Sequence, residues 1–316
     1  MKIIVVGAGL AGLACARELR RAGHDVTLLD KSRGAGGRMS SRRVDTGSGD
    51  VTFDHGAQYF TVRDPLFAAE VQQWAEQGLA ARWPVAGPDA FVGVPAMNAP
   101  LKALAAQLDV RLNTRVSVIS RDGDPWSVST KDGLVLEAEA VIIALPAEQA
   151  AELLHSVVSD MAALARSVVS EPCWTVMAVF PGPLAAIEVC LSGKDPDVLG
   201  WAARNSAKPE RGGPEAWVIQ GTADWSKRHL EQPGAWVESR LLAALAERLE
   251  IVLPAPLWQT AHRWRYARSG VHDAGSLWDP ASGLGVCGDW LVAPRVEGAW
   301  LSGTQLADRI GRALPS

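Results

Sequence analysis

Cysteine and histidine are both scarce and scattered in this sequence of 316 residues. The four cysteines are Cys15, Cys173, Cys190 and Cys287, and none belongs to a Cys-x-x-Cys pair. Such spacing favours reduced thiols in a cytosolic enzyme over a disulfide framework. The six histidines are equally dispersed, so no spacing typical of a metal site is present, and we expect no bound metal.

The sequence also lacks an excess of positive charge and a long apolar run. Its 31 Lys and Arg residues are outnumbered by 35 Asp and Glu residues, which leaves no basic surplus for a nucleic-acid backbone. No stretch approaches the roughly 18 uncharged apolar residues of a membrane span. The apolar residues 1–16 resemble a signal peptide only superficially, because their three glycines have the spacing of a nucleotide-binding turn. We therefore expect a cytoplasmic protein without nucleic-acid or membrane partners.

The start of the chain has the pattern of a β-strand, a glycine-rich turn, an α-helix and a second strand. Ile3–Val6 is a β-branched run typical of a buried strand, residues 10–22 have helical apolar spacing, and Asp25–Leu29 is the second strand. Residues 7–12 match the Gly-x-Gly-x-x-Gly fingerprint, whose glycines permit a tight turn, approach of a pyrophosphate and packing of helix on strand. Asp30 then stands where an acid accepts hydrogen bonds from ribose. This unit predicts dinucleotide binding, and alone it would also suit an NAD-dependent dehydrogenase.

The remaining chain predicts the second half of that domain and a separate substrate domain. Residues 110–138 contain four short strand patterns separated by turns, the first at residues 110–113, and together they indicate a β-meander. Residues 141–145 are a further buried strand, and residues 299–314 are a final helix. We expect an α/β fold in which a Rossmann-like dinucleotide-binding domain with a β-meander, residues 1–60, 98–147 and 270–316, is interleaved with an α+β substrate domain, residues 61–97 and 148–269.

Three further motifs distinguish a flavoprotein from a dehydrogenase. Residues 30–38 end in Gly-Gly-Arg, and Arg38 would add a cation to phosphates already held by a helix N-terminus. Residues 53–61 have the sequence Phe-Asp-His-Gly-Ala-Gln-Tyr-Phe-Thr. Near the end of the chain a Gly-Asp pair at residues 288–289 precedes Val-Glu-Gly-Ala-Trp at residues 296–300. This set resembles the flavoprotein amine-oxidase superfamily.

A more specific resemblance is to the renalase family, and within it to the bacterial members. Residues 54–60 and 264–266 carry it, and it extends over essentially the whole chain. It implies an α/β fold of the flavin amine-oxidase type and an FAD held without a covalent bond. Residues 53–61 would lie beside the flavin ring, and the helix after residue 296 would direct its positive end at the flavin pyrimidine. The residues implied to bind FAD are Gly7, Gly9, Leu10, Ala11, Gly12, Asp30, Lys31, Gly37, Arg38, His55, Gly56, Ala57, Gln58, Tyr59, Val116, Gly288, Asp289, Val296, Glu297, Gly298 and Ala299.

The resemblance also implies an activity, the oxidation of misreduced nicotinamide dinucleotides. The substrates would be isomeric dihydropyridine forms of NAD(P)H, with the 2-dihydro isomer favoured and the 6-dihydro isomer as a further candidate. Hydride would pass to flavin N5, and O2 would take the electrons, which gives NAD(P)+ and hydrogen peroxide. Such a donor regains aromaticity on oxidation and needs no strong base, so no catalytic residue is assigned.

Five residues beside the flavin motifs are candidates for contact with the nicotinamide substrate. Tyr59 and Trp264 would stack on a ring, whereas Arg63, Arg265 and Arg295 would bind phosphate or carboxamide, since a guanidinium binds phosphate through two hydrogen bonds. Core packing of the aromatic rings and structural salt bridges of the arginines are the alternatives. On a strand, Trp264 and Arg265 would point to opposite faces.

Other functions stay open on the sequence alone. An amine oxidase or desaturase of the same fold is the nearest alternative. Amine oxidases of this superfamily usually keep a lysine near flavin N5, whereas this chain has no lysine after Lys227 and none in a recognisable motif. A nucleotide-binding sensor that holds FAD without turnover is another alternative. We expect His55 to pack or bond locally rather than act as an acid or base, and Cys287 to be a buried, inert thiol.

Overall fold

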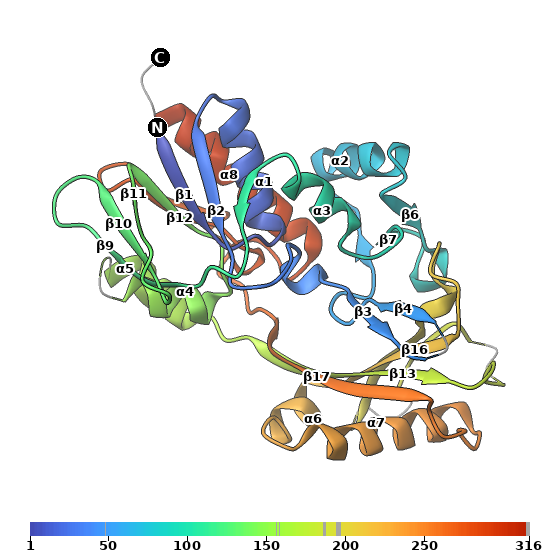
Figure 1. Ribbon diagram of the computed structural model, residues 1–316. Helices are drawn as coiled ribbons and strands as arrows, with labels where there is room; N and C mark the ends of the chain where they lie inside the picture. Colours follow the sequence, from blue (N-terminus) through green and yellow to red (C-terminus); the bar gives the residue numbers. More distant parts are fainter. Residues whose placement is uncertain (48, 156, 158, 186–187, 194–196, 314–316) are drawn as a thin grey trace.

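The computed structural model describes residues 1–47, 49–155, 157, 159–185, 188–193 and 197–313 and forms two lobes on two main β-sheets (Figure 1). The first lobe holds a six-stranded sheet of order β18-β19-β12-β1-β2-β8. All neighbouring strands pair in parallel except β18 with β19, which confirms the expected α/β class. The strands are β1 (Lys2–Val6), β2 (Asp25–Leu29), β8 (Asp109–Arg111), β12 (Ala140–Ile143), β18 (Leu277–Asp279) and β19 (Leu284–Val286).

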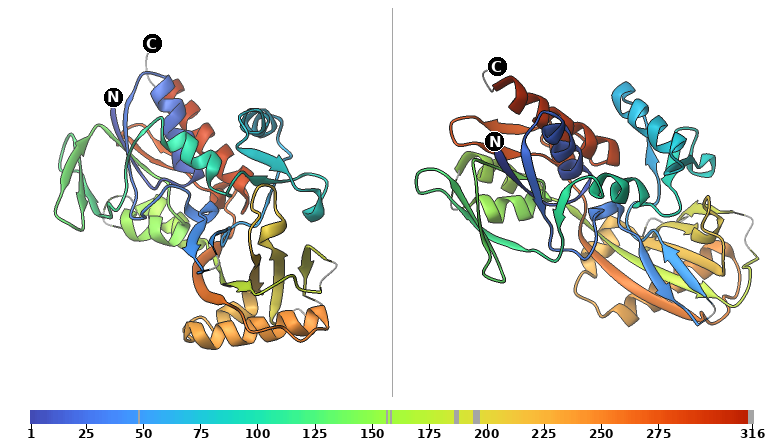
Figure 2. Two further views of the ribbon diagram at one scale, coloured as in Figure 1. Left: turned by 45° about the vertical axis from the view of Figure 1, so that its right-hand side comes forward. Right: turned by 45° about the horizontal axis from the view of Figure 1, so that its top comes forward.

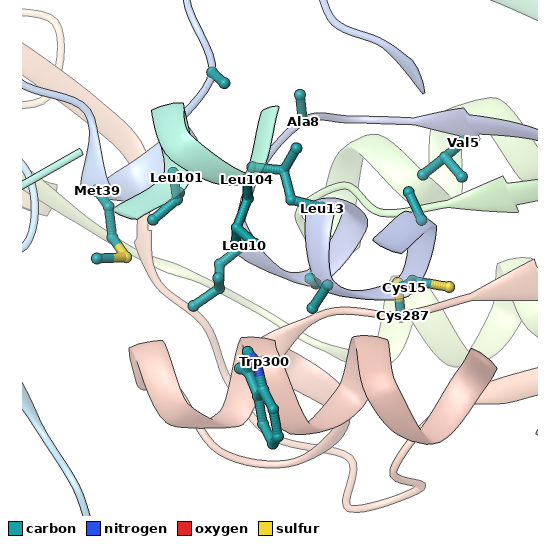
Figure 3. Packing of buried hydrophobic residues seen from close by; sticks show 14 of the residues in the cluster. Val5, Ala8, Leu10, Leu13, Cys15, Met39, Leu101, Leu104, Cys287 and Trp300 are labelled. Atoms are coloured by element: carbon teal, nitrogen blue, oxygen red, sulfur yellow. The ribbon is translucent and has the colours of Figure 1, made fainter. Parts of the chain in front are cut away.

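Helices cover one face of this sheet, and the meander with two further helices covers the other. Figure 3 shows Leu10 and Leu13 between β1 and the other helices of the first face, with Cys287 beside Cys15. Both cysteines are completely buried. The first face carries α1 (Leu10–Arg21), α3 (Ala99–Ala105) and α8 (Val296–Ala313); the second carries α4 (Ala147–Leu154), α5 (Ser159–Ser167), β9 (Val116–Ser120), β10 (Trp126–Thr130) and β11 (Val135–Ala138).

Two sequence-based boundaries are corrected by the structure. The strand predicted at residues 110–113 is β8, which pairs in parallel with β2 instead of joining the three-stranded meander. It follows α3 and so completes a parallel crossover. The last helix begins at Val296, because Gly298 lets the preceding loop pack on its first turn, where a Cβ would lie 2.2 Å from the oxygen of Ala293. The predicted end of that helix at Leu314 lies outside the described residues.

The second lobe is built on a five-stranded antiparallel sheet of order β14-β15-β16-β13-β17. Helices α6 and α7 run along its outer side, away from the first lobe (Figures 1 and 2). Its inner side packs on a two-stranded sheet through Phe53, Met177 and Val218. The elements are β13 (Glu171–Phe180), β14 (Cys190–Ser192), β15 (Leu199–Arg204), β16 (Glu215–Gly221), β17 (Trp258–Arg268), α6 (Ala223–Arg228), α7 (Gly234–Leu249), β3 (Arg42–Asp45) and β4 (Asp50–Phe53).

A small unit between the lobes completes the fold. Phe67 and Trp74 of α2 are buried in the same core as α1 and α8, so residues 61–97 pack on the first lobe as well as bordering the second. The discontinuous division into two domains therefore stays a proposal. No helix of the described residues is long and apolar enough to cross a bilayer. The unit comprises α2 (Pro65–Glu76), β5 (Phe60–Thr61), β6 (Ala80–Arg82), β7 (Ala90–Gly93) and η2 (Pro84–Ala86); the other 3-10 helices are η1 (Gly37–Met39), η3 (Asn205–Ala207) and η4 (Asp289–Leu291).

Candidate functional site

The turn between β1 and α1 is built for close approach of a ligand to backbone. A Cβ at Gly7, whose φ is +110°, would lie 2.4 Å from the oxygen of Ala144, and one at Gly12 would lie 2.0 Å from the oxygen of Gly7. At Gly9, by contrast, no heavy atom would lie within 4 Å of a Cβ. The helix begins at Leu10 without a side-chain cap, so its first N–H groups are left for a ligand. This open, uncapped turn fits the pyrophosphate of a dinucleotide.

Asp30 lies beside that turn at the end of β2. Its Oδ2 accepts a hydrogen bond from the amide of Ala8 at 2.7 Å, and its Oδ1 accepts one from the amide of Ser32 at 2.7 Å. Each carboxylate oxygen keeps a lone pair for a ribose hydroxyl. Lys31 is exposed and donates to Gln149 at 3.2 Å, and Val116 is half-buried at the start of β9.

The Gly-Gly-Arg segment folds over the glycine turn and reaches the C-terminal motif. Gly37 has φ +52°, and a Cβ there would lie 3.3 Å from the Cα of Gly9. Arg38 Nη2 pairs with Asp289 Oδ1 at 2.5 Å, and Asp289 Oδ2 accepts from the hydroxyl of Ser269 at 3.1 Å. Gly288 donates its amide to a buried hydroxyl on α8 at 2.9 Å. Motifs 251 residues apart are therefore in direct contact.

Residues 54–59 form a turn that rests on the Gly-Gly-Arg segment. The amide of Ala57 donates to the oxygen of Arg38 at 2.9 Å, and a Cβ at Gly56 would lie 2.1 Å from that same oxygen. From the second lobe, Gln220 Nε2 donates to the oxygen of Gly56 at 3.0 Å, and an indole N–H of β17 donates to the oxygen of the neighbouring His55. The turn thus contacts both the Gly-Gly-Arg segment and side chains of the second lobe.

The first turn of α8 lies at the edge of this region. It contains four predicted cofactor residues, Val296, Glu297, Gly298 and Ala299. Glu297 is buried, and its Oε1 accepts hydrogen bonds from the amides of residues 63 and 64 at 2.6 and 2.7 Å. This carboxylate ties α8 to the start of α2.

The five predicted substrate contacts do not all come together. Trp264 donates its indole N–H to the oxygen of His55 at 2.9 Å and lies at one end of the turn. Tyr59, at the other end, packs at a tilt against Trp83 and Trp201, with ring centroids 6.3 and 5.6 Å away. These are two separate aromatic groups, each in contact with the turn.

The three predicted arginines lie outside these aromatic groups. Arg265 forms a salt bridge with Glu231 at 2.7 Å, which is the structural alternative given above. It lies on the face of β17 opposite Trp264, because strand alternation turns it toward α6 and α7. Arg63 and Arg295 are both exposed; Arg295 directly precedes α8, and the amide of Arg63 donates to Glu297 in its first turn. The structure therefore does not bring Arg265 to the turn.

His55 lies in a ring cluster with His262 and Trp264. Its ring centroid is 4.8 Å from that of His262 and 5.2 Å from that of Trp264. Burial, together with His262 and the nearby Arg42, lowers the pKa of His55 to about 4. Its buried Nδ1 has no hydrogen-bond partner among the described residues. At neutral pH the imidazole is uncharged and poorly suited to donate a proton.

The depressed pKa of His55 makes stability depend on pH. The unfolded histidine binds a proton near pH 6.5 and the folded one only near pH 4, so the free energy of unfolding should fall as pH is lowered through this window. The full loss is about 3 kcal/mol. Urea titrations at several pH values should show this slope in the parent and a flatter one in His55→Gln. The same change at the exposed His272 is the control, and a parallel slope in His55→Gln would contradict the prediction.

A buried ion cluster behind the turn was not found from the sequence. Asp54 Oδ2 accepts from Arg211 at 2.7 Å and from Lys208 Nζ at 3.3 Å, and its Oδ1 accepts from the amide of Met97 at 2.9 Å. Burial opposes ionisation of Asp54, but the charges of Lys208 and Arg211 outweigh it and lower its pKa below the ordinary value. Lys208 Nζ also donates to Gln58 Oε1 at 3.2 Å. The acid of the motif is therefore fully engaged by cations of the second lobe.

Comparison with known protein families agrees with this geometry. A family model described as flavin-containing amine oxidoreductase matches residues 75–311, and one for an NAD(P)-binding Rossmann-like domain matches residues 5–73. The Rossmann-like unit predicted from the glycine fingerprint is thereby confirmed.

Individual relatives cover nearly the whole chain. Renalase from Mus musculus is 27% identical over 304 residues, which is 86% of this chain and 87% of that protein. A proposed protoporphyrinogen oxidase from Exiguobacterium has a TM-score of 0.79 at 11% identity, and cyclohexylamine oxidase from Brevibacterium oxydans has 0.73 at 14% identity. Both structures match over 99% of each chain. At these identities they establish the fold, which is the predicted flavin amine-oxidase type.

Proposed function

We propose that this chain, which belongs to the flavin-containing amine oxidoreductase family, oxidises isomeric dihydronicotinamides to NAD(P)+. It is an FAD-dependent oxidoreductase; its substrate is the proposal. The resemblance to bacterial renalases suggests the 2-dihydro isomer first and the 6-dihydro isomer second. The similarity to a mammalian renalase over most of both chains supports this choice. We place the reaction in the cytoplasm, with O2 as acceptor.

The observation that favours a dihydronicotinamide over an amine as the substrate is the net positive charge of the buried ion cluster around Asp54. Asp54 is the acid of the flavin-side motif, and it faces two buried cations, Lys208 and Arg211. The cluster therefore has one positive charge more than negative charge. A protonated amine would be repelled by it, whereas a dihydronicotinamide dinucleotide has a neutral ring and anionic phosphates.

The residues of the chain have binding and orienting roles in this scheme. The uncapped turn at Gly9 would hold the FAD pyrophosphate, Asp30 the ribose, and Arg38 would add positive charge near the phosphates. Bound FAD supplies a hydride acceptor whose electrons O2 can remove. Tyr59 or Trp264, which lie at opposite ends of the turn, would orient the nicotinamide ring by stacking. Since oxidation restores aromaticity, a neutral His55 need not take up a proton.

Product analysis in air tests this proposal. The purified yellow protein would be supplied with 2-dihydroNAD, 6-dihydroNAD, ordinary NADH or cyclohexylamine, while NAD+ and peroxide are measured separately. We expect equal amounts of NAD+ and peroxide from a misreduced isomer and neither product above background from NADH. Peroxide from the amine alone would instead identify an amine oxidase.

A further inference from the structure

Three buried ionic side chains at the turn of residues 54–59 do not balance in charge. The side chains of Asp54 and Lys208 are 0% exposed, and that of Arg211 is 2% exposed. One carboxylate is thus the counter-ion of two cations in a region where water cannot screen their charges. The nearby Glu188 does not compensate, because it is half-exposed and pairs with Arg248 at 3.0 Å. The surplus positive charge is built into the fold.

Three groups around Lys208 are partners for its ammonium group. Nζ donates to the Asp54 carboxylate and to the side-chain amide oxygen of Gln58, and it lies 5.3 Å from the ring centroid of Trp83. Burial and the charge of Arg211 lower the pKa of Lys208 below its ordinary value, although the carboxylate of Asp54 opposes this shift. An acid, a carbonyl and an aromatic face are all partners for an ammonium group.

Hydrogen bonds connect this ammonium group to the turn. Gln58 accepts from Lys208, and its Nε2 donates to the oxygens of Asp54 and Gly56. The turn also packs on the backbone of Arg38, whose oxygen accepts a hydrogen bond from the amide of Ala57 at 2.9 Å. One glutamine side chain therefore separates the buried charge from the segment implied to lie beside the flavin.

We propose that Lys208 is a positioning residue that acts through Gln58 and raises the reduction potential of the bound FAD. The inference rests on the proposed placement of residues 53–61 beside the flavin ring, and it does not depend on the nicotinamide substrate. A flavin gains negative charge on reduction, and an unscreened cation nearby favours the reduced form. The side chain of Lys208 is completely buried behind the turn.

The test is a potentiometric titration of FAD-loaded protein against a reference dye, with no substrate present. Lys208→Met should shift the equilibrium toward oxidised FAD at least tenfold, which is about 30 mV for a two-electron couple. Asp54 keeps Arg211 at 2.7 Å in this variant, so no carboxylate is left unpaired. Lys208→Arg should restore the potential. Lys227→Met, the same change at an exposed lysine on α6, should leave it unchanged.

A purely structural role predicts a different pattern. If Lys208 only pins the loop after η3 to the turn, Lys208→Met will lower thermal stability or FAD retention while the retained FAD keeps the parent potential, and the proposal is overturned. Should Lys208→Met fail to hold FAD, Arg211→Met removes the other cation of the cluster and should give a shift of the same sign. An unchanged potential there, or failure of both variants to bind FAD, also overturns the proposal. None of these results depends on whether a dihydronicotinamide is oxidised.

Discussion

Asp54→Asn is expected to destabilise the folded protein by about 3–5 kcal/mol, the cost of leaving buried cations without their counter-ion. Lys208 and Arg211 both bind this carboxylate, and the amide of Met97 donates to its other oxygen. Asparagine nearly preserves the size of the side chain but not its charge. Urea unfolding followed by circular dichroism measures the loss.

Two further variants make the measurement specific. Asp308→Asn breaks an exposed ion pair with Arg312 on α8 and should cost less than about 1 kcal/mol. The double variant of Asp54→Asn with Lys208→Met removes one of the stranded cations and should recover part of the loss. If Asp54→Asn and Asp308→Asn unfold at the same urea concentration, the cluster is not a major source of stability.

Gly56→Ala is expected to weaken FAD binding by about tenfold to a hundredfold. Its new Cβ would lie 2.1 Å from the oxygen of Arg38 and 3.2 Å from Trp264, so the turn must move away from the Gly-Gly-Arg segment. Overpacking of this kind costs about 1–3 kcal/mol, which is about one to two decades in Kd. Fluorescence of FAD released on dilution gives the affinity.

Gly34→Ala is the matched control for this variant. Gly34 lies in residues 30–38, the Gly-Gly-Arg segment on which the turn packs, but a Cβ there would have no heavy atom within 4 Å. It should retain FAD as the parent does. Equal retention by Gly56→Ala would show that the contact between the turn and Arg38 is not needed to hold the cofactor.

Local features of the first lobe could be predicted because each depends on neighbouring residues. The glycines of residues 7–12 predict a tight turn. The structure shows the reason, because side chains at Gly7 and Gly12 would collide with backbone oxygens. Asp30 could be predicted as the ribose-binding acid because it directly follows the short strand β2. In the second lobe, alternation along β17 likewise predicted that Trp264 and Arg265 would point to opposite faces.

The cluster around Asp54 could not be predicted because its members are far apart in sequence. Lys208 and Arg211 lie more than 150 residues from Asp54, in a loop without a recognisable motif. Nothing local distinguishes them from exposed loop cations. The partner of Arg265, Glu231, was missed for the same reason, because it comes from the segment between α6 and α7. Pairings between segments that are distant in the sequence become visible only when the chain is folded.

The most direct test of the central claim is anaerobic stopped-flow absorbance of the FAD-loaded protein mixed with each dihydronicotinamide isomer and with a panel of amines. We predict rapid bleaching of the flavin by 2-dihydroNAD or 2-dihydroNADP, with colour restored by air, and no comparable bleaching by NADH or amines. Rapid bleaching by an amine, with none by any misreduced nicotinamide, would contradict the proposed function.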